Sequence, residues 1–466
     1  MTVLVFMATI AVACAATVEA ASPPLRLHPD NPHYFLFRGK PTIIIGSGEH
    51  YGAVLNLDFD YVRYLETLSR DGLRHTRTFS GVYCEQYGAF SIARNTLAPA
   101  PHRYITPWAR SDQAGYANGG NKFDLSRFDP AYFARLRDFM TQASRRGVVV
   151  EMNLYCPFYG DEMWRLSPMN AANNVNGVGR VTRTDVYTLD RNGGLLLYHE
   201  AVVRKIVAEL NDFDNLYYEI CNEPYFGGVT MDWQRRMVDV IVETERKLPR
   251  KHLISLNIAN GSAEVQNLHP DVSILNFHYA SPPNAVAVNY HLGRPIGDNE
   301  TGFKGTGDTH YRMEAWEFIL AGGALFSHLD YSFVAGHEDG TFQYPPTQPG
   351  GGNAAFRKQM RILNDFIHGF AFVRMRPDAA TVRAVPKGVR ARVLSEDGQQ
   401  YAIYLFGKAT GEMTLALPKG RYAVQWLDTI NGSVAASQTL NHGGGEARLT
   451  LPAYAEDVAL SIKRRR

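Results

Sequence analysis

The sequence predicts an α/β protein that consists of a (β/α)8 TIM barrel followed by a small all-β sandwich domain. Two observations support the barrel: short apolar runs alternate with segments of helical periodicity, and this unit occurs eight times within residues 21–372. Strands that are buried on both faces and alternate with helices form parallel sheets, and eight such units close into a barrel. After residue 372 the pattern becomes short alternating runs, which is typical of a β-sandwich. An open doubly wound sheet is the alternative for the first domain.

The elements of the barrel can be assigned in chain order. A helix begins at Asp129-Pro130, where a capping aspartate precedes a proline in the first turn. The last helix is the clearest, with apolar residues from Phe356 to Phe370 at steps of four, three, four and three. The predicted barrel strands are 41–47, 74–79, 148–154, 216–221, 253–258, 272–277, 295–298 and 324–329.

The segment 373–466 contains at least six short runs of alternating apolar and polar residues. Turn signals such as Asp397-Gly398 and Asn431-Gly432 separate them. The predicted strands of this domain are 389–394, 401–406, 413–417, 422–427, 447–451 and 458–462. Six or more short strands in so short a segment predict a sandwich.

The composition excludes several classes of function. The chain of 466 residues has 48 Lys plus Arg against 46 Asp plus Glu, a net charge of +2, and no basic run. Such a chain lacks the electrostatic footprint of a nucleic-acid or membrane-surface protein. The four cysteines, at positions 14, 84, 156 and 221, show no CxxC spacing. We therefore expect no metal, no cofactor and no nucleic-acid partner, and we expect the cysteines of the mature chain to be reduced and buried.

The N-terminal segment resembles a secretory signal peptide. Residues 1–18 carry no charge, and small residues follow at Ala20 and Ala21, so cleavage near Ala20 would remove residues 1–20. This predicts a secreted or periplasmic protein. The segment lacks a basic residue at its start, and Ala13-Cys14 leaves a lipoprotein or a membrane anchor as alternatives. Since no second apolar run of about 18 residues follows, we expect no stable membrane insertion, and we expect a monomer.

Three long segments follow predicted strands: 80–128, 155–194 and about 20 residues after the eighth strand. All three lie at the C-terminal face of the predicted barrel, where the active sites of barrel enzymes are built, and long segments of this kind commonly bind ligands. They contain many aromatic residues. Tyr155, Trp164 and Trp108 are the candidates for platforms on which sugar rings stack, and packing of the loops is the alternative.

Two glutamates stand at the mouths of opposite barrel strands. Glu223 follows strand 216–221, and Glu300 follows strand 295–298. The fourth and seventh strands face one another across an eight-stranded barrel, so these carboxyl groups can lie on either side of one bond in a substrate. A retaining glycosidase needs two carboxyl groups about 5–5.5 Å apart, one as the nucleophile and the other as the acid and then the base.

The motif Asn222-Glu223-Pro224 at the end of the fourth strand, together with Pro-x4-Glu-x-Gly ending at Gly302, resembles the clan A glycoside hydrolases. This superfamily includes the family 5 cellulases and mannanases. The resemblance covers the barrel and implies that Glu223 is the general acid/base and Glu300 the nucleophile. It further implies that Asn222 donates a hydrogen bond to the sugar 2-hydroxyl.

The same resemblance extends to other strand ends. Arg77 matches an arginine that the family places near the nucleophile, and His278-Tyr279 matches its histidine and tyrosine after the sixth strand. Two strand ends depart from family 5, which usually has a histidine where this chain has Asn153-Leu154-Tyr155 and a tryptophan where it has the segment 328–331. The clan is therefore better supported than family 5.

Other polar residues near the strand ends have two interpretations each. Glu49 and His50 line the sugar site or satisfy loop backbone. Asp298 is a rival nucleophile, because strand alternation would place it on the same inward face as Glu300. Glu151 is expected to be an ion-pair partner inside the barrel. Glu223 and Glu300 could themselves be structural carboxylates paired with Arg77.

The function predicted from these observations is an exported retaining glycoside hydrolase that degrades β-linked oligo- or polysaccharides without a cofactor. Three alternatives remain: a barrel protein that binds carbohydrate without cleaving it, a side-chain-cleaving exo-glycosidase similar to the apiosidase-like barrels, and an isomerase or lyase that binds phosphate in the glycine-rich loop 302–307. Residue types do not discriminate among sugars, linkages, or endo and exo action.

Overall fold

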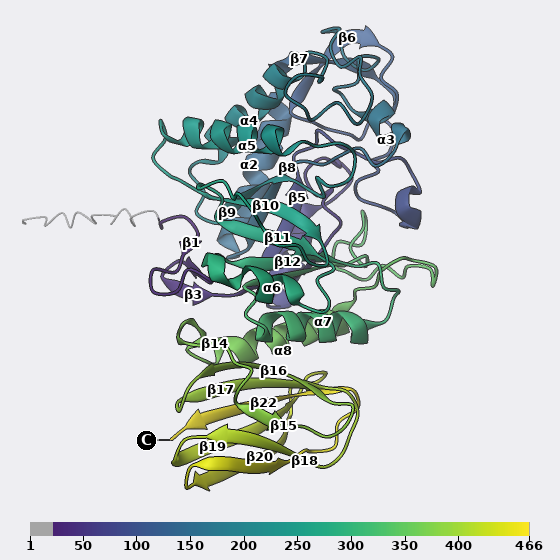
Figure 1. Cartoon of the computed structure of the whole chain (residues 1–466). Coiled ribbons are helices and arrows are strands. Elements are labelled where there is room, and N and C mark those ends of the chain that lie inside the picture. The colour runs from purple at the N-terminus through teal and green to yellow at the C-terminus, as the bar shows by residue number, and fades with distance from the viewer. Residues whose placement is uncertain (1–21, 466) are drawn as a thin grey trace, which may run out of the picture.

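The computed structural model describes residues 22–465. Its barrel is built from eight parallel strands (Figure 1). The strands are β4 (Ile44–Gly48), β5 (His75–Phe79), β8 (Val149–Tyr155), β9 (Leu216–Cys221), β10 (Leu253–Asn260), β11 (Ile274–His278), β12 (Ile296–Thr301) and β13 (Leu325–Leu329). Their order is β4-β13-β12-β11-β10-β9-β8-β5. The backbone N–H of Phe79, in β5, donates to the carbonyl of Tyr51, just beyond β4, so the two end strands meet and nearly close the barrel. The predicted barrel is confirmed.

Helices surround the barrel as the periodicity predicts. Asp129 caps the second of them by accepting a hydrogen bond from the N–H of Ala131, and Pro130 occupies its first turn. The helices are α1 (Tyr61–Arg70), α2 (Pro130–Arg145), α3 (Asp161–Leu166), α4 (Leu196–Leu210), α5 (Met231–Glu245), α6 (Asn284–Asn289), α7 (Asp308–Leu320) and α8 (Ala354–His368). The expectation of a helix after every strand is wrong in one unit. The segment 261–273 between β10 and β11 has no helix, because it contains Gly261 and Pro270 and lacks apolar periodicity.

A small antiparallel sheet that the sequence did not predict precedes the barrel. It consists of β1 (Arg26–Leu27), β2 (Phe35–Phe37) and β3 (Lys40–Thr42). Leu25 donates its N–H to the carbonyl of Asp214, and Arg38 forms an ion pair with the Asp214 side chain at 2.7 Å. Since Asp214 lies just before β9, this sheet sits at the N-terminal end of the barrel, opposite the strand ends that carry the candidate site.

The two longest loops contain more regular structure than the sequence predicts. The segment after β5 forms a 3-10 turn, η1 (Ala89–Ser91), and a hairpin of β6 (Trp108–Ala114) and β7 (Asn121–Phe128). The segment after β8 contains α3. Phe123 of the hairpin forms a β-bridge with Asn174, which joins the two segments to one another.

The C-terminal domain is a sandwich of a six-stranded and a three-stranded antiparallel sheet. Its strands are β14 (Arg376–Pro377), β15 (Val382–Ala384), β16 (Arg390–Glu396), β17 (Gln400–Phe406), β18 (Glu412–Leu417), β19 (Gly420–Asp428), β20 (Val434–His442), β21 (Gly445–Thr450) and β22 (Asp457–Arg464). Buried side chains such as Ile403, Trp426 and Leu460 fill the space between the sheets. The sequence missed β20, which is a largely exposed edge strand with few apolar residues.

The sandwich packs against helices α7 and α8 of the barrel (Figure 1). Short 3-10 turns, η2 (Tyr290–Leu292) and η3 (Phe372–Arg374), lie between α6 and β12 and between α8 and β14. Trp316 of α7 stacks on Tyr404 of β17, with 5.5 Å between ring centroids. The predicted signal peptide lies outside the described residues. Among the residues that are described, none of the helices combines the length and the apolar character needed to cross a membrane.

Candidate active site

A cavity of about 710 Å³ opens at the C-terminal ends of the barrel strands. Its volume falls in the range of small-ligand sites. Residues that follow different strands line this cavity, so the barrel brings together side chains that are far apart in the sequence. The lining includes His50, Tyr51, Glu85, Phe90, Tyr159, Asn222, Glu223, Phe226, Tyr279, Glu300, Phe303 and Lys304.

The two predicted glutamates lie together in this cavity. Glu223 follows β9 and Glu300 is in β12, and the side chains are buried. One carboxylate oxygen of each, together with Nδ1 of His278, lies within 4.8 Å of the others. This upper limit on the distance between the nearest oxygens is compatible with the carboxyl spacing of about 5–5.5 Å that retaining glycosidases need.

Glu300 is held by three donors that come from different parts of the barrel. The hydroxyl of Tyr51 donates to Oε2 at 2.6 Å, and the hydroxyl of Tyr279 donates to Oε1 at 2.7 Å. Arg77 donates from Nη1 to Oε2 at 3.1 Å. Both carboxylate oxygens are therefore oriented, and the side chain is fixed on the floor of the cavity.

These contacts keep Glu300 ionised. Burial by itself raises its pKa, but the charges of His278 and Arg77 and the hydrogen bonds from Tyr279 and Tyr51 outweigh burial and lower the pKa to about 2. An ionised carboxylate with its oxygens oriented is the state that a nucleophile requires.

Glu223 is held by a different set of partners. The hydroxyl of Tyr159 donates to Oε2 at 2.6 Å, and Nδ1 of His278 lies 3.2 Å from Oε1. The backbone N–H of Glu223 donates to Oδ1 of Asn257, in β10, at 3.1 Å. No arginine or lysine pairs with the Glu223 carboxylate among the described residues, and this distinguishes it from Glu300.

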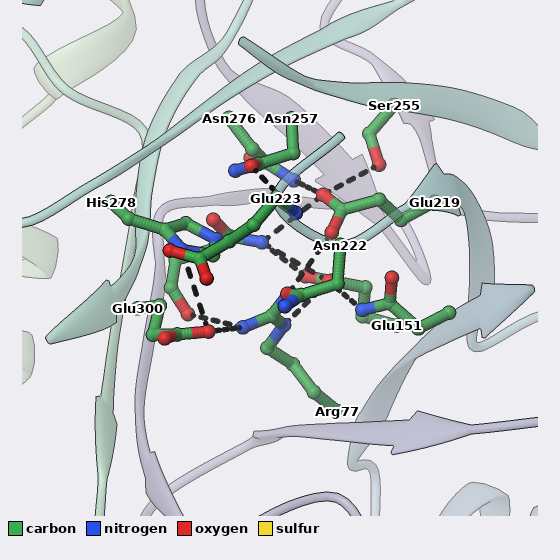
Figure 2. Close-up of polar contacts among 12 residues, drawn as sticks. Arg77, Glu151, Glu219, Asn222, Glu223, Ser255, Asn257, Asn276, His278 and Glu300 are labelled. Atoms are coloured by element: carbon green, nitrogen blue, oxygen red, sulfur yellow. Dashed lines mark hydrogen bonds and ion pairs between the residues drawn. The ribbon is translucent and has the colours of Figure 1, made fainter. Parts of the chain in front are cut away.

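Arg77, in β5, lies at the centre of the charge network beneath the two glutamates (Figure 2). Its guanidinium forms ion pairs with Glu151 at 2.5 Å, Glu219 at 3.0 Å and Glu300 at 3.1 Å. It also donates to Oδ1 of Asn222 at 2.9 Å. The predicted ion-pair role of Glu151 is confirmed, and Glu219, four residues before Glu223, is a third buried carboxylate to which the sequence analysis gave no role.

His278 lies between the two glutamates, as Figure 2 shows. Its Nδ1 is 3.2 Å from Glu223 and 3.4 Å from Glu300. Burial lowers its pKa, but the charges of the two glutamates outweigh burial, and the pKa is raised from its ordinary value. Nδ1 of His278 is therefore within hydrogen-bonding reach of both carboxylates.

Three residues of the site have a backbone conformation that L-residues rarely adopt. The φ angles of Tyr51, Glu223 and Tyr279 are 65°, 37° and 52°. Such residues cost free energy and persist where the surrounding structure holds them, which is common at functional sites. Each lies within three residues of the end of a barrel strand, and each lines the cavity.

Asp298 does not share the face of Glu300, so this expectation of the sequence analysis is wrong. The strand register shifts between Asp298 and Thr301, which is a β-bulge and breaks the alternation of side chains. Asn299 consequently faces the barrel interior, where its amide donates to Glu151 at 3.0 Å. Asp298 accepts a hydrogen bond from the N–H of Ala280 at 3.3 Å and lies outside the cavity lining.

Of the other site residues predicted from the sequence, some line the cavity and some do not. His50, Asn222 and Tyr279 line it. Glu49 instead accepts hydrogen bonds from the N–H groups of Gly52 and Ala53 at 3.0 Å, so it holds the loop backbone.

The predicted stacking platforms do not reach the cavity. Tyr155 donates its hydroxyl to the carbonyl of His199, and Trp164 donates its indole N–H to the carbonyl of Val181. These residues and Trp108 are almost fully buried and pack the long loops together. Their large apolar surface is better removed from water inside the loops than left at the cavity mouth.

Apart from His50 and Tyr279, the aromatic residues that face the cavity were not singled out from the sequence. Three phenylalanines with partly exposed side chains, Phe90, Phe226 and Phe303, stand at its rim. Tyr51 and Tyr159 provide the hydroxyls that hold the two glutamates. Tyr51 had a sequence signal, since it directly follows Glu49-His50 at the end of a barrel strand. The phenylalanines lie in loops without a distinguishing pattern.

Glu223, His278 and Glu300 form a cluster whose spacing would also admit a metal ion. The carboxylate oxygens already accept hydrogen bonds from tyrosyl hydroxyls, so a metal would compete with these donors. The three cysteines of the described residues, Cys84, Cys156 and Cys221, are free and buried, as expected.

Comparison with known proteins supports the resemblance at the level of the fold. No family model and no curated protein matches the chain. Among solved structures, a glycoside hydrolase family 5 protein from Bacteroides vulgatus superimposes with a TM-score of 0.64 at 13% identity, over 95% of this chain and 93% of that one. A second structure named as a glycoside hydrolase gives 0.63 at 14% identity, over 95% and 97%.

A family 5 mannosidase from Rhizomucor miehei gives a TM-score of 0.50 at 12% identity, over 75% of this chain and its whole length. The first two matches cover both the barrel and the sandwich. The chain therefore shares the fold of these glycoside hydrolase structures, a parallel barrel followed by a sandwich.

Proposed function

We propose that this protein is a retaining glycoside hydrolase that cleaves β-linked glycans by double displacement. The observation that carries the proposal is the pair Glu223 and Glu300, whose carboxylate oxygens lie within 4.8 Å of one another in the main cavity. The different partners of the two side chains support different roles for them. The fold shared with glycoside hydrolases also supports this chemistry. A fold alone does not assign a function, so the proposal rests on the two glutamates.

In the first step Glu300 attacks the anomeric carbon of the bound sugar. The bond from that carbon to the leaving oxygen breaks, and Glu223 gives its proton to the leaving oxygen, so that the aglycone departs as an alcohol. The product is a glycosyl ester on Glu300. Tyr51 and Tyr279, which hold the carboxylate in the free protein, orient it for this attack.

In the second step Glu223, now ionised, takes a proton from a water molecule. The water oxygen bonds to the anomeric carbon, and the ester bond to Glu300 breaks, which restores both side chains. Tyr159 positions Glu223 in both steps through its 2.6 Å hydrogen bond. Asn222, whose amide is fixed by Arg77 and Tyr159, is placed to bind the sugar 2-hydroxyl.

A neutral carbohydrate fits the properties of the cavity. The phenylalanines at the rim present aromatic faces, which bind the apolar faces of sugar rings, and the tyrosines and asparagine present hydrogen-bonding groups. The chain as a whole has a net charge of only +2, which gives little long-range attraction for a charged substrate.

The test is hydrolysis of a panel of aryl β-glycosides and plant polysaccharides, followed by NMR of the first product. We expect the β-anomer to form first, and activity to persist in a chelator. Formation of the α-anomer would exclude the retaining mechanism. Binding of glycans without turnover would favour the carbohydrate-binding alternative, and loss of activity in the chelator would point to a metal at the Glu223–His278–Glu300 cluster.

Substitution of each glutamate assigns the two roles. We expect Glu300→Ala to lose turnover and to regain it with azide, which attacks from the face of the missing carboxylate and gives an α-glycosyl azide. Glu223→Ala should lose about 10²- to 10⁴-fold on substrates with poor leaving groups. With an activated leaving group and azide it should give the β-glycosyl azide. Normal turnover by Glu300→Ala overturns the assignment.

We also propose that the protein is exported. The support is the uncharged, apolar segment 1–18 followed by small residues. N-terminal sequencing of the protein recovered from the periplasm or the medium tests this, and we expect a chain that begins at or near Ala21. An intact N-terminus in the cytoplasmic fraction contradicts it.

A further inference from the structure

Glu85 is a third carboxyl group in the main cavity, and the proposed mechanism does not use it. It follows β5 at the start of the long loop, and its side chain is 4% exposed. Its N–H donates to the carbonyl of Leu97 at 2.8 Å, which closes the loop 85–97. This loop carries Phe90 to the rim and separates the main cavity from a second cavity of about 530 Å³, since Glu85 lines both.

The hydrogen-bond donors that hold Glu85 are neutral, and they do not occupy all the lone pairs of its carboxylate. The hydroxyl of Tyr83 donates to Oε1 at 2.9 Å, and the amide of Asn95 donates to Oε2 at 2.5 Å. Among the described residues no cationic side chain pairs with this carboxylate. A carboxylate has about four lone-pair sites, so the two donors leave about two of them free.

Glu85 lines the same cavity as Glu223 and Glu300, and its pKa responds to that surrounding. Burial and, to a smaller extent, the charge of Glu300 raise the pKa of Glu85 to about 7, against the hydrogen bonds from Tyr83 and Asn95. In turn, the charge of Glu85 adds to the effect of burial in raising the pKa of Cys156, another residue that lines the cavity. A carboxyl group near its pKa can both accept and donate hydrogen bonds.

We propose that Glu85 is a substrate-binding residue that forms hydrogen bonds with two neighbouring hydroxyl groups of a sugar in the cavity. A buried carboxyl group without a cation costs free energy, and a ligand that completes its hydrogen bonds offsets this cost. Hydroxyl groups suit this site because they donate to a carboxylate and also accept from a carboxylic acid. The inference rests on the proposed function in that the ligand is a carbohydrate.

The experiment uses the full chain and the aryl glycoside that the panel identifies. Glu85→Ala should raise KM by about 10- to 100-fold, which is the effect of losing hydrogen bonds to a charged group, and should change kcat by less than about 3-fold. Glu85→Gln, which preserves shape, should give a smaller rise in KM and serves where the alanine variant does not fold. Asp58→Asn is the control, because this carboxylate lines only the second cavity and pairs with Arg103 at 2.6 Å.

Monodeoxy derivatives of the same glycoside separate binding from a structural role. The wild type should bind the derivative that lacks a contacted hydroxyl more weakly than the parent glycoside, whereas Glu85→Ala should bind the two compounds equally well. If Glu85→Ala loses as much affinity for the derivative as the wild type does, the proposal is overturned. A lower Tm of Glu85→Ala with an unchanged KM also overturns it. Tighter binding of an amino-deoxy derivative would show that the ligand is an ammonium group instead and also overturns it.

Calorimetric binding of the glycoside to Glu300→Gln keeps this proposal distinct from the proposed function. Binding that depends on Glu85, without turnover by the wild type, supports the role of Glu85 and contradicts hydrolysis. Turnover that is indifferent to Glu85 supports hydrolysis and contradicts the role of Glu85. If the protein neither binds nor cleaves the glycoside, both proposals are contradicted.

Discussion

At the scale of single residues, one arginine organises the charges of the site. Arg77 is buried, and its planar guanidinium reaches Glu151, Glu219 and Glu300 in different directions. A fork of five N–H donors can satisfy several carboxylates at once, whereas an ammonium group is a single compact charge. The ionised state of Glu300 therefore depends on the type of cation as well as on its presence.

Arg77→Lys is expected to lower the free energy of unfolding by about 3–5 kcal/mol, because it leaves buried carboxylates without a partner. It should also raise the pKa of Glu300, since a lysine ammonium cannot contact Glu151, Glu219 and Glu300 at once and the nearby charge of Arg77 is one cause of the low pKa. Urea denaturation measures the first effect. The control is Arg63→Lys, at an exposed ion pair with Asp339, which should change stability by less than about 0.5 kcal/mol. Equal effects of the two substitutions contradict the central role of Arg77.

Glu49 gives a prediction about pH. Burial raises the pKa of this carboxyl group to about 7, against hydrogen bonds from Thr96, Ala53 and Gly52, whereas its ordinary value is 4.5. The folded state therefore holds the proton more tightly than the unfolded state. The contribution of Glu49 to the free energy of unfolding is full below pH 4.5 and is lost as pH rises to about 7.

Glu49→Gln should therefore become more stable relative to the wild type as pH rises from about 5 to about 8. The difference in Tm between the two proteins is the quantity to measure. Buried histidines such as His75 and His328, whose pKa values burial lowers to about 4, act on both proteins in the opposite direction and cancel in this difference. A difference in Tm that does not vary with pH contradicts the prediction.

At the scale of elements, the ends of the barrel strands decide which side chains meet. The left-handed turns after β4, β9 and β11 direct Tyr51, Glu223 and Tyr279 into the cavity. The bulge in β12 turns Asn299 inward and removes Asp298 from the site. Small departures from regular strand geometry therefore decide which side chains form the candidate site.

Gly52, directly after Tyr51, is the tightest point of the first of these turns. A Cβ atom at this position would overlap the backbone carbonyl of Thr96. We expect Gly52→Ala to displace Tyr51 from Glu300 and to lower kcat/KM by about 100-fold, since a shift of about 1 Å at a catalytic group has an effect of that size. Gly443→Ala, where nothing lies within 4 Å, is the control and should be neutral in the same assay. Unchanged kcat/KM for Gly52→Ala contradicts a role of this turn.

Elements with a clear pattern of apolar residues were largely predictable from the sequence, and elements without such a pattern were not. All eight barrel strands and the capped start of α2 follow from apolar runs and from Asp129-Pro130. The hairpin of β6 and β7, in which few apolar residues alternate with many polar ones, was missed, as was the exposed edge strand β20. Periodicity reports burial of one face, so strands without a buried face leave no periodic signal.

At the scale of the whole molecule, the sandwich is joined to the barrel by buried polar contacts. Arg312 of α7 forms an ion pair with Asp457 of β22 at 2.7 Å, and both are almost completely buried. The hydroxyls of Tyr404 and Thr429 donate to the same carboxylate. These contacts, with the stacked rings of Trp316 and Tyr404, indicate that the sandwich stabilises the barrel through α7.

Asp457→Ala should lower the free energy of unfolding by about 3–5 kcal/mol, because it leaves Arg312 buried without this partner. In calorimetry we expect the wild type to unfold in one transition and the variant to unfold in two, with the sandwich and the barrel separated. Glu412→Ala, on an exposed position of β18, is the matched control and should keep one transition. Two transitions in the wild type would contradict a coupled interface.

The sequence by itself determined the eight-unit barrel, the following sandwich, and the two glutamates at opposite strand ends, because these depend on local periodicity and on short motifs next to it. Only the tertiary structure decided the rest of the site. It buried Tyr155 and Trp164 in loop packing, brought Phe90, Phe226 and Phe303 to the rim, and placed Glu85 in the cavity. The physical reason is that an aromatic or carboxyl group in a loop has no periodic pattern, and its exposure is set by contacts with segments far away in the chain.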